Sequence, residues 1–572
     1  MEILIRESSF GRCLNYLSNG RYFPYPEPDL RQWEKYSTSN MSNNSSELET
    51  NEGQIFDFSG PEDPDCPKNW PRSVKSIVML DIMFLNFSFY AASAIFTPSI
   101  PRIEEDFNAT TAVGTLGLSL FVMAYGIGPL ILSPLSHLAS IGRTPVYLLG
   151  SLAFCLFNIG TALANNMWTI LILRFLSGFI GSAPISVGGA TLMEVYGPNE
   201  VPYAIALYAV SGVCGPILGP VCFQSQCGFA MTFLAFLCMD ANMRTDSWHT
   251  RSNGVNMINK SCSEKWQTWS ASLWLIAGTT AFTTVFIFFF LPETLSTNIL
   301  LRRARRIRAK TGNIWPQTQS EMIISKASFL ATILKQTLDD FKLSCMDPVI
   351  VFVNIHTMLI YGILYLWFEF FPFVFDGIYQ FNAIQQALAF FGILVGAIVS
   401  VIFYVLWLYF FYQPKSRDSN VILEPEARLV PGQIGAVCIP VCLFIFAWSS
   451  RASVPWIVPI IGTAFFAPGF YLTFQSTLNY LGESYPRHAA SVFAGNTFFR
   501  SFFGGALPLA APRMLESLGI GWASSILGFI SVAMVPLPFI LKRVSNRSIL
   551  EQDLADFPKY GKRLRSWSPY AN

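Results

Sequence analysis

The sequence predicts an all-α polytopic membrane protein with twelve transmembrane helices in two six-helix bundles, and three observations support this fold class. Of the 572 residues, 52% are hydrophobic and only 13% are charged, a balance outside that of soluble globular proteins. Twelve stretches are apolar over the ~20 residues that a helix needs to cross a hydrocarbon layer of about 30 Å. Lysines and arginines concentrate in alternate loops, as in chains that insert with a fixed orientation.

The spans fall into two sets of six that are separated by a charged connection. The first set is expected near residues 74–96, 113–134, 145–164, 168–190, 203–223 and 272–291, and the second near residues 348–371, 386–411, 433–449, 454–478, 489–511 and 520–541. The basic loop residues, which include Arg143, Arg302 to Lys310 and Arg487, all lie on one side of the membrane in this arrangement. Because cytoplasmic loops are enriched in Lys and Arg, we expect both termini in the cytoplasm and the protein in the plasma membrane.

The chain accordingly divides into five parts. A disordered cytoplasmic tail is expected over residues 1–72, where polar residues dominate and no apolar signal segment is visible. The two bundles occupy residues 73–291 and 348–541. A basic cytoplasmic loop at 292–347 joins them, and residues 542–572 form a cytoplasmic tail.

One segment, residues 224–265, does not fit this arrangement. It combines a short apolar run with soluble, irregular sequence between the fifth and sixth spans. We interpret it as an atypical insertion, which is either a translated intervening sequence or a genuine extension of the outer face.

Two ionisable residues at membrane depth are the candidates for proton coupling. Asp81 lies about one third of the way into the first span and Arg174 lies in a glycine-rich fourth span. Such residues are costly in a membrane and usually functional. Burial favours the protonated form of a carboxyl group and a nearby arginine favours the ionised form, so Asp81 could bind and release a proton as its surroundings change. The alternative is that Asp81 makes one structural hydrogen bond at a helix end.

Two further groups of polar or small residues are candidate working parts. A turn between the second and third spans could hold the cytoplasmic face closed, and its residues are Ser133, Pro134, His137, Gly142 and Arg143. In the second half, polar and aromatic residues at membrane depth are candidates for the substrate path, namely Tyr361, Glu369, Asn496 and Arg500.

Several chemistries are not indicated. No phosphate-binding G-x-x-x-x-G-K-[ST] motif, zinc-protease H-E-x-x-H motif or suitably placed G-x-S-x-G motif occurs. The eleven cysteines lack metal-site spacing. We therefore expect no enzyme activity, no cofactor and no metal. The net charge of +2 gives no reason to expect a nucleic-acid partner.

The motifs resemble those of the fungal drug:proton antiporters of the major facilitator superfamily, in the twelve-span branch linked to multidrug, benomyl and azole resistance. The resemblance covers about residues 60–543 and includes P-E-D-P-D-C-P-K-N-W-P, S-P-L-S-x-x-x-x-I-G-R-x-P, R-F-L-S-G-F-x-G-S and G-P-x-L-G-P. It implies the major facilitator fold, alternating access, and export of lipophilic or cationic drugs and toxins in exchange for protons by a monomer in the lipid bilayer. It also implies that Arg174 is the family's buried arginine and that the antiporter motif comprises Gly215, Pro216, Gly219 and Pro220.

Two departures from the family leave alternatives open. His137 stands where the family usually has an acid, so the turn before Arg143 loses a fixed negative charge, and residues 224–265 replace a short loop. A transport-inactive or misfolded membrane protein, or an importer of a small organic nutrient, are the alternatives to an exporter.

Overall fold

The computed structural model describes residues 2–18, 21–22, 25, 58, 63–197, 200–224, 269–311, 318, 321, 341–414, 425–485 and 489–549. Regular structure in these ranges is helical, apart from an isolated bridge between Ser8 and Pro292. The predicted all-α fold is therefore confirmed. The contacts divide the chain into unit 1 (Met1–Ala204 and Gly228–Phe341) and unit 2 (Ile205–Cys227 and Lys342–Asn572).

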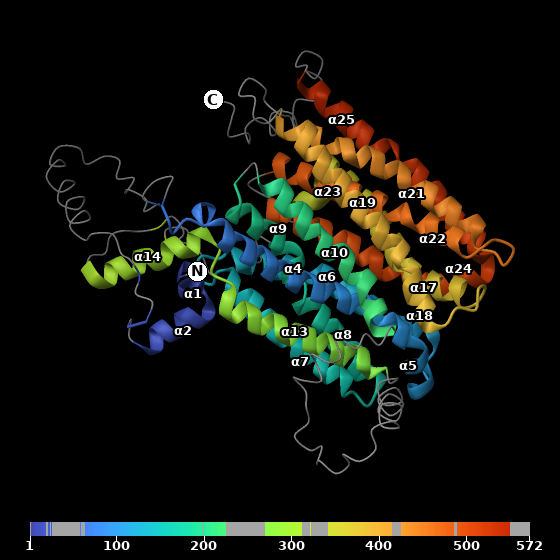
Figure 1. Ribbon diagram of the computed structural model, residues 1–572, viewed down its shortest axis with the longest axis horizontal. Coiled ribbons are helices and arrows are strands. Elements are labelled where there is room, and N and C mark those ends of the chain that lie inside the picture. The colour runs from blue at the N-terminus through green and yellow to red at the C-terminus, as the bar shows by residue number, and fades with distance from the viewer. Residues whose placement is uncertain are drawn as a thin grey trace, which may run out of the picture. The chain divides into compact units, whose positions relative to one another are not determined.

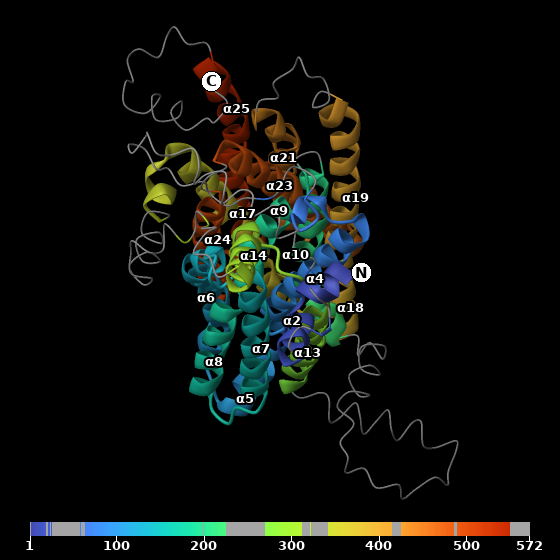
Figure 2. The ribbon, with the colours of Figure 1, turned by 90° about the vertical axis from the view of Figure 1, so that its left-hand side faces the viewer.

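Unit 1 is built from five long apolar spans and short flanking helices, coloured blue to green in Figure 1. Its helices are α1 (Glu2–Glu7), α2 (Ser9–Leu17), α4 (Arg72–Ala94), α5 (Ile100–Phe107), α6 (Thr111–His137), α7 (Arg143–Ala162), α8 (Met167–Ile180), α9 (Ala183–Val195), α13 (Ser270–Phe290) and α14 (Ser296–Thr311). Helices α6, α7 and α8 lie side by side in Figure 2, and α13 packs against α4 and α7. The fourth span is interrupted between α8 and α9, where Pro184 occupies the first turn of the second piece, a position that proline tolerates.

Unit 2 contains the remaining α-helices. They are α10 (Val201–Gln224), α17 (Pro348–Phe375), α18 (Ala383–Ala389), α19 (Phe391–Trp407), α21 (Val430–Ser449), α22 (Ile457–Ala464), α23 (Phe466–Ser484), α24 (Ala489–Met534) and α25 (Pro536–Ile549). Helix α23 packs against both α19 and α21, all orange in Figure 1. From Ile205 onward, α10 groups with this unit, and the Tyr471 hydroxyl donates to the Ala206 carbonyl over 2.9 Å.

Eleven helical segments among the described residues are long and apolar enough to cross a membrane. The last, Val492–Lys542, has 51 residues, and a straight helix of that length would measure roughly 75 Å at 1.5 Å per residue. It is divided at Gly519, whose φ of 68° and ψ of 167° are not helical. The two pieces correspond to the eleventh and twelfth predicted spans.

The N-terminal tail departs from the expected disorder within residues 2–17. Leu4 is fully buried, the Phe10 ring lies 4.8 Å from that of Phe289, and Arg6 forms an ion pair with Asp65 at 3.3 Å. These contacts join residues distant in the chain, so the polar average composition of the tail did not indicate them. Most of residues 19–62, the atypical segment from residue 225 to 265 and the C-terminal tail from residue 550 lie outside the described residues.

Candidate functional site

Asp81 is a fully buried acid on α4. Neither of its carboxylate oxygens has a hydrogen-bond partner within the part of the chain that the structure describes. The structural hydrogen bond that was the alternative to a proton-binding role is therefore absent from that part. A buried carboxyl group without partners is stabilised in its protonated, neutral form, because ionisation would require an uncompensated charge.

Arg174, on α8, is also fully buried, but it is held by groups other than Asp81. Its guanidinium donates to the carbonyls of Gly117 at 3.3 Å and Ala92 at 3.1 Å. The same group lies 4.5 Å and 4.2 Å from the ring centroids of Phe96 and Phe121. Carbonyl dipoles and aromatic faces both stabilise a cation removed from water.

The structure does not bring Asp81 and Arg174 into contact. Arg174 binds α4 at Ala92, eleven residues beyond Asp81, which is about 16 Å along a helix axis. Gly178, one turn after Arg174, permits the close approach of α8 to α6, since a Cβ atom there would collide with the Phe121 carbonyl. Arg174 thus fastens α8 to α4 and α6 at a level different from that of Asp81.

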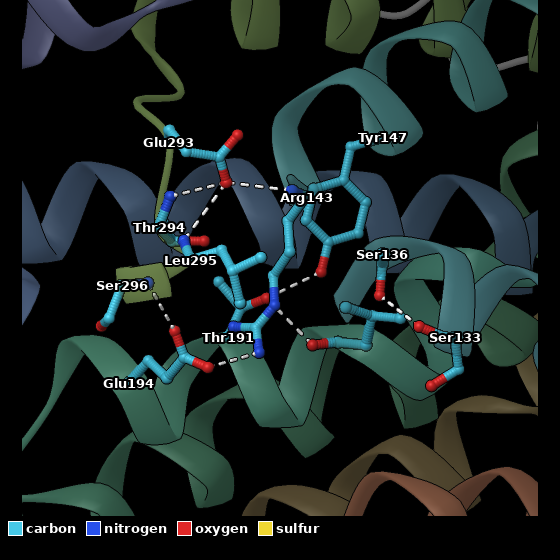
Figure 3. Close-up of polar contacts among 11 residues, drawn as sticks. Ser133, Ser136, Arg143, Tyr147, Thr191, Glu194, Glu293, Thr294, Leu295 and Ser296 are labelled. Atoms are coloured by element: carbon cyan, nitrogen blue, oxygen red, sulfur yellow. Dashed lines mark hydrogen bonds and ion pairs between the residues drawn. The ribbon is translucent and has the colours of Figure 1, made fainter. Parts of the chain in front are cut away.

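The predicted turn at Gly142 and Arg143 is held by two carboxylates, one at the end of α9 and one in the connection between α13 and α14 (Figure 3). The Arg143 guanidinium forms an ion pair with Glu194, at the end of α9, over 2.7 Å. The Arg143 backbone N–H donates to Glu293 over 2.9 Å. Glu293 also accepts from the N–H groups of Thr294 and Leu295, both at 3.2 Å, so one carboxylate joins the turn to the start of the 292–347 connection.

We call this cluster, Gly142, Arg143, Glu194 and Glu293, the inner latch of unit 1. Glu194 and Glu293 place two carboxyl groups beside the turn, in which the sequence has His137 where the family usually has an acid. Glu293 lies within the residues 60–543 that carry the resemblance, but no spacing in the sequence indicates that it or Glu194 reaches Arg143. His137 ends α6, and its Nε2 atom has no partner among the described residues.

Ser133 and Pro134 lie inside α6 and not at the latch. The Ser136 hydroxyl donates to the Ser133 carbonyl over 2.7 Å, a contact within one helix. The structure therefore brings Gly142 and Arg143 to the latch and leaves these two residues as part of the preceding helix end.

Gly142→Ala is expected to weaken the inner latch. The φ of Gly142 is +83°, and an added Cβ would collide with Glu293 Oε2, so we expect a loss of about 1–3 kcal/mol in the free energy of unfolding. Gly189→Ala in α9 is the matched control, because nothing lies within 4 Å of its added Cβ and alanine favours a helix. Thermal unfolding of the purified variants in detergent measures both, and equal melting temperatures would contradict this role for Gly142.

In unit 2, three of the four substrate-path candidates gather where α17 packs on α24. The Arg500 guanidinium lies 5.0 Å from the Tyr361 ring and 4.7 Å from the Phe474 ring. One turn earlier, the Asn496 side chain donates to Asn354 at 3.0 Å and to Thr357 at 2.7 Å. The result is a buried polar and aromatic cluster at membrane depth.

Glu369 is the fourth candidate. It lies eight residues beyond Tyr361 on α17, which corresponds to about 12 Å of helix, and it is half-buried. The antiporter-motif residues lie on α10, where Gly215, Pro216 and Gly219 are buried. The side chain of Pro220 lies outside the described residues.

Unit 2 contains an arginine and glutamate pair that the sequence analysis missed. Arg428, at the start of the α21 span, donates to Glu483, at the end of α23, over 2.9 Å and 2.5 Å. The Arg428 guanidinium lies 3.6 Å from the Tyr412 ring, and its side chain is only 2% exposed. The pair resembles Arg143 with Glu194, which likewise joins a helix start to a helix end. Arg143 and Glu194 are 51 residues apart in the sequence, and Arg428 and Glu483 are 55 residues apart. This similar spacing in the two halves of the chain could have indicated the repeated pair.

Glu483→Gln is expected to destabilise unit 2 by about 1–3 kcal/mol, because the buried Arg428 guanidinium loses its negative partner. The loss is limited because Glu483 is partly exposed and water screens the interaction. Glu516→Gln is the control, since that glutamate is exposed on α24. Chemical unfolding of both variants followed by aromatic fluorescence measures the difference. A loss no larger than that of the control would show that the pair contributes nothing.

No group of three His, Cys, Asp or Glu side chains that could hold a metal ion occurs in the residues that the structure describes.

Comparison with known proteins gives the family. The model of the Major Facilitator Superfamily matches residues 82–508. The chain is 37% identical to the transporter mfs1 of Schizosaccharomyces pombe, over 99% of both chains. It is 32% identical to fluconazole resistance protein 1 of Saccharomyces cerevisiae over 93% of this chain and 88% of that protein. It is also 32% identical to the cycloheximide resistance protein of Candida maltosa over 94% and 97% of the two chains.

A solved structure agrees in fold. The xylose transporter XylE from E. coli, in a partially occluded inward-open conformation, superposes with a TM-score of 0.53 at 13% identity, over 81% of this chain and 96% of that one. The predicted major facilitator fold is thereby confirmed. The family match, the long identities and the helical spans together assign the chain to the Major Facilitator Superfamily as a multi-pass membrane transporter.

Proposed function

We propose that this transporter exports lipophilic or cationic drugs and toxins in exchange for protons, by alternating access. The observation that carries the proposal is the similarity to two proteins named for fluconazole and cycloheximide resistance, over at least 88% of their length. Aromatic faces at Tyr361 and Phe474 beside Arg500 are suited to planar, lipophilic molecules, because stacking and apolar area stabilise them.

Asp81 is the proposed proton-binding residue, supported by its complete burial and its lack of partners among the described residues. Arg174 contributes by position: it holds α8 against α4 and α6, so movement at that junction changes the surroundings of α4. The buried glycines and proline of α10 let helices pack closely. The inner latch is the proposed device that opens and closes the cytoplasmic face.

The orientation and assembly belong to the same proposal. Both termini face the cytoplasm, as the basic loops favour, and the protein acts as a monomer in the plasma membrane. The proposed six-helix bundles comprise residues 73–291 and 348–541, with residues 224–265 as an insertion between the fifth and sixth spans.

Drug susceptibility of a yeast strain without its own exporters tests the export direction. Cells expressing this chain are expected to tolerate higher concentrations of fluconazole and cycloheximide and to retain less of a fluorescent drug. The Asp81→Asn variant, matched for surface expression, is the control. Greater accumulation in expressing cells would indicate an importer, and unchanged accumulation with normal surface expression would indicate a transport-inactive protein.

A further inference from the structure

Helix α2 has apolar residues on the side that faces away from the protein. Cys13 is exposed, Tyr16 is 85% exposed and Leu17 is 80% exposed. These positions, i, i+3 and i+4, share one helix face. We call them the outward stripe. An exposed apolar patch of this kind marks a surface for contact with a membrane or another protein.

One turn earlier, the same side of α2 is seated against a transmembrane helix. Phe10, one turn before Cys13, lies 4.8 Å from Phe289 and 6.1 Å from Phe288, ring centroid to centroid. Both belong to the last turn of α13, a candidate span. Figure 1 shows α2 beside one end of unit 1. Helix α2 is therefore held where a span ends, at the level of the membrane interface.

The surface of α13 that α2 adjoins is itself a lipid-facing one. Phe282, Val285 and Phe289 on α13 are 41%, 56% and 38% exposed, as expected for side chains that contact acyl chains. Because Phe10 contacts Phe289, the outward stripe continues this exposed apolar surface beyond the end of the span.

Positive charge next to α2 favours an anionic surface. Arg12 lies on α2, and its charge contributes to lowering the pKa of Arg302, after the larger effect of burial; Glu293 and Glu7 act in the opposite sense. Arg302 is itself paired with Glu293 at 3.7 Å, so Arg12 is the cation on α2 that an anionic leaflet attracts. Arg305, on α14, is exposed.

We propose that α2 is an interfacial helix that docks on an anionic phospholipid surface through the outward stripe. Amphipathic helices of this kind lie in the plane of the interface with their apolar face toward the acyl chains. The choice of an anionic leaflet rests on the proposed cytoplasmic orientation, whereas the seating of the stripe in lipid does not.

Docking has a consequence for the inner latch. The carbonyl of Glu7, two residues before the start of α2, accepts a hydrogen bond from the Glu293 N–H over 3.3 Å, and Ser8 pairs with Pro292. A helix fixed in the interface therefore fixes the backbone of the residue that holds the Gly142 turn.

Depth-dependent quenching of the full-length protein tests the proposal. An environment-sensitive fluorescent amino acid replaces Tyr16, with one protein per nanodisc, and is quenched either by lipids brominated along their acyl chains or by iodide in water. A second protein with the same residue at Leu156, 58% exposed in the α7 span, is the control for lipid contact. Brominated lipid is expected to quench both probes, and iodide is expected to reach neither fully.

Two results would overturn the proposal. The first is a residue-16 probe that iodide quenches completely and brominated lipid leaves unchanged while the residue-156 probe is quenched. The second is a residue-16 probe that is shielded from iodide only in nanodiscs with two copies of the protein, because a second copy then covers the outward stripe. Phosphatidylserine is expected to increase lipid quenching at residue 16 by about twofold over phosphatidylcholine alone, and equal quenching would reject the anionic preference. These discs have the same lipid in both leaflets, so failure here is independent of the proposed export and orientation.

Discussion

Asp81→Asn is expected to abolish transport driven by a pH gradient while substrate exchange without a gradient continues. The amide has nearly the shape of the protonated carboxyl group and can neither bind nor release a proton. Asp81 is fully buried and lacks a hydrogen-bond partner in the described ranges, so the neutral amide breaks no contact there. We expect gradient-driven uptake into reconstituted vesicles to fall by more than about tenfold, as for other intramembrane carboxylates that relay protons.

The control for Asp81 is Asp106→Asn, which removes an exposed acid at the end of α5 in the same unit. Its gradient-driven uptake is expected to remain within about twofold of the unchanged protein, since exposed charges interact weakly. If Asp81→Asn retains gradient-driven uptake, another residue binds the transported proton. If it loses exchange as well, Asp81 acts in substrate binding or in folding.

Arg174→Ala is expected to have the largest effect on stability. It removes two hydrogen bonds from a charged donor and two cation–aromatic contacts. Such bonds contribute about 1.5–3 kcal/mol each and desolvated cation–aromatic contacts about 2 kcal/mol, so a loss above about 4 kcal/mol is expected. Arg174→Lys keeps the charge without the planar fork. Its loss in the free energy of unfolding is expected to lie between zero and that of Arg174→Ala.

Arg451→Ala is the matched control for Arg174, because its guanidinium also lies over an aromatic ring, at 5.0 Å from Trp448, but at an exposed position. A loss below about 1 kcal/mol is expected there. Surface expression and thermal unfolding in detergent measure all three variants. If Arg174→Ala were as stable as Arg451→Ala, the contacts of Arg174 with α4 and α6 would not hold unit 1 together.

The fold was largely predictable because a membrane imposes one strong constraint. Backbone groups in hydrocarbon must bond within their own helix, so apolar length alone located the spans. The division of α24 at Gly519 follows from the same rule, since one span cannot use 51 residues. The docked helices α1 and α2 escaped prediction because they are short and are held by contacts such as Arg6 with Asp65, which no local pattern indicates.

The candidate site was predictable in its residue types and not in its partners. Rarity at membrane depth singled out Asp81 and Arg174 correctly as buried residues. Their separation was not predictable, because it depends on which turn of α4 faces α8. Glu194 and Glu293 look like ordinary ends of helices in the sequence, and only the approach of α9 and α13 to Arg143 makes them part of the latch.

The most direct test of proton-coupled export is uptake of a fluorescent drug by vesicles that contain only the purified protein. With the vesicle interior more acidic than the medium, drug is expected to accumulate against its own gradient, and a protonophore added with a permeant counter-ion is expected to release it. Accumulation that is the same with and without the pH gradient would contradict the account.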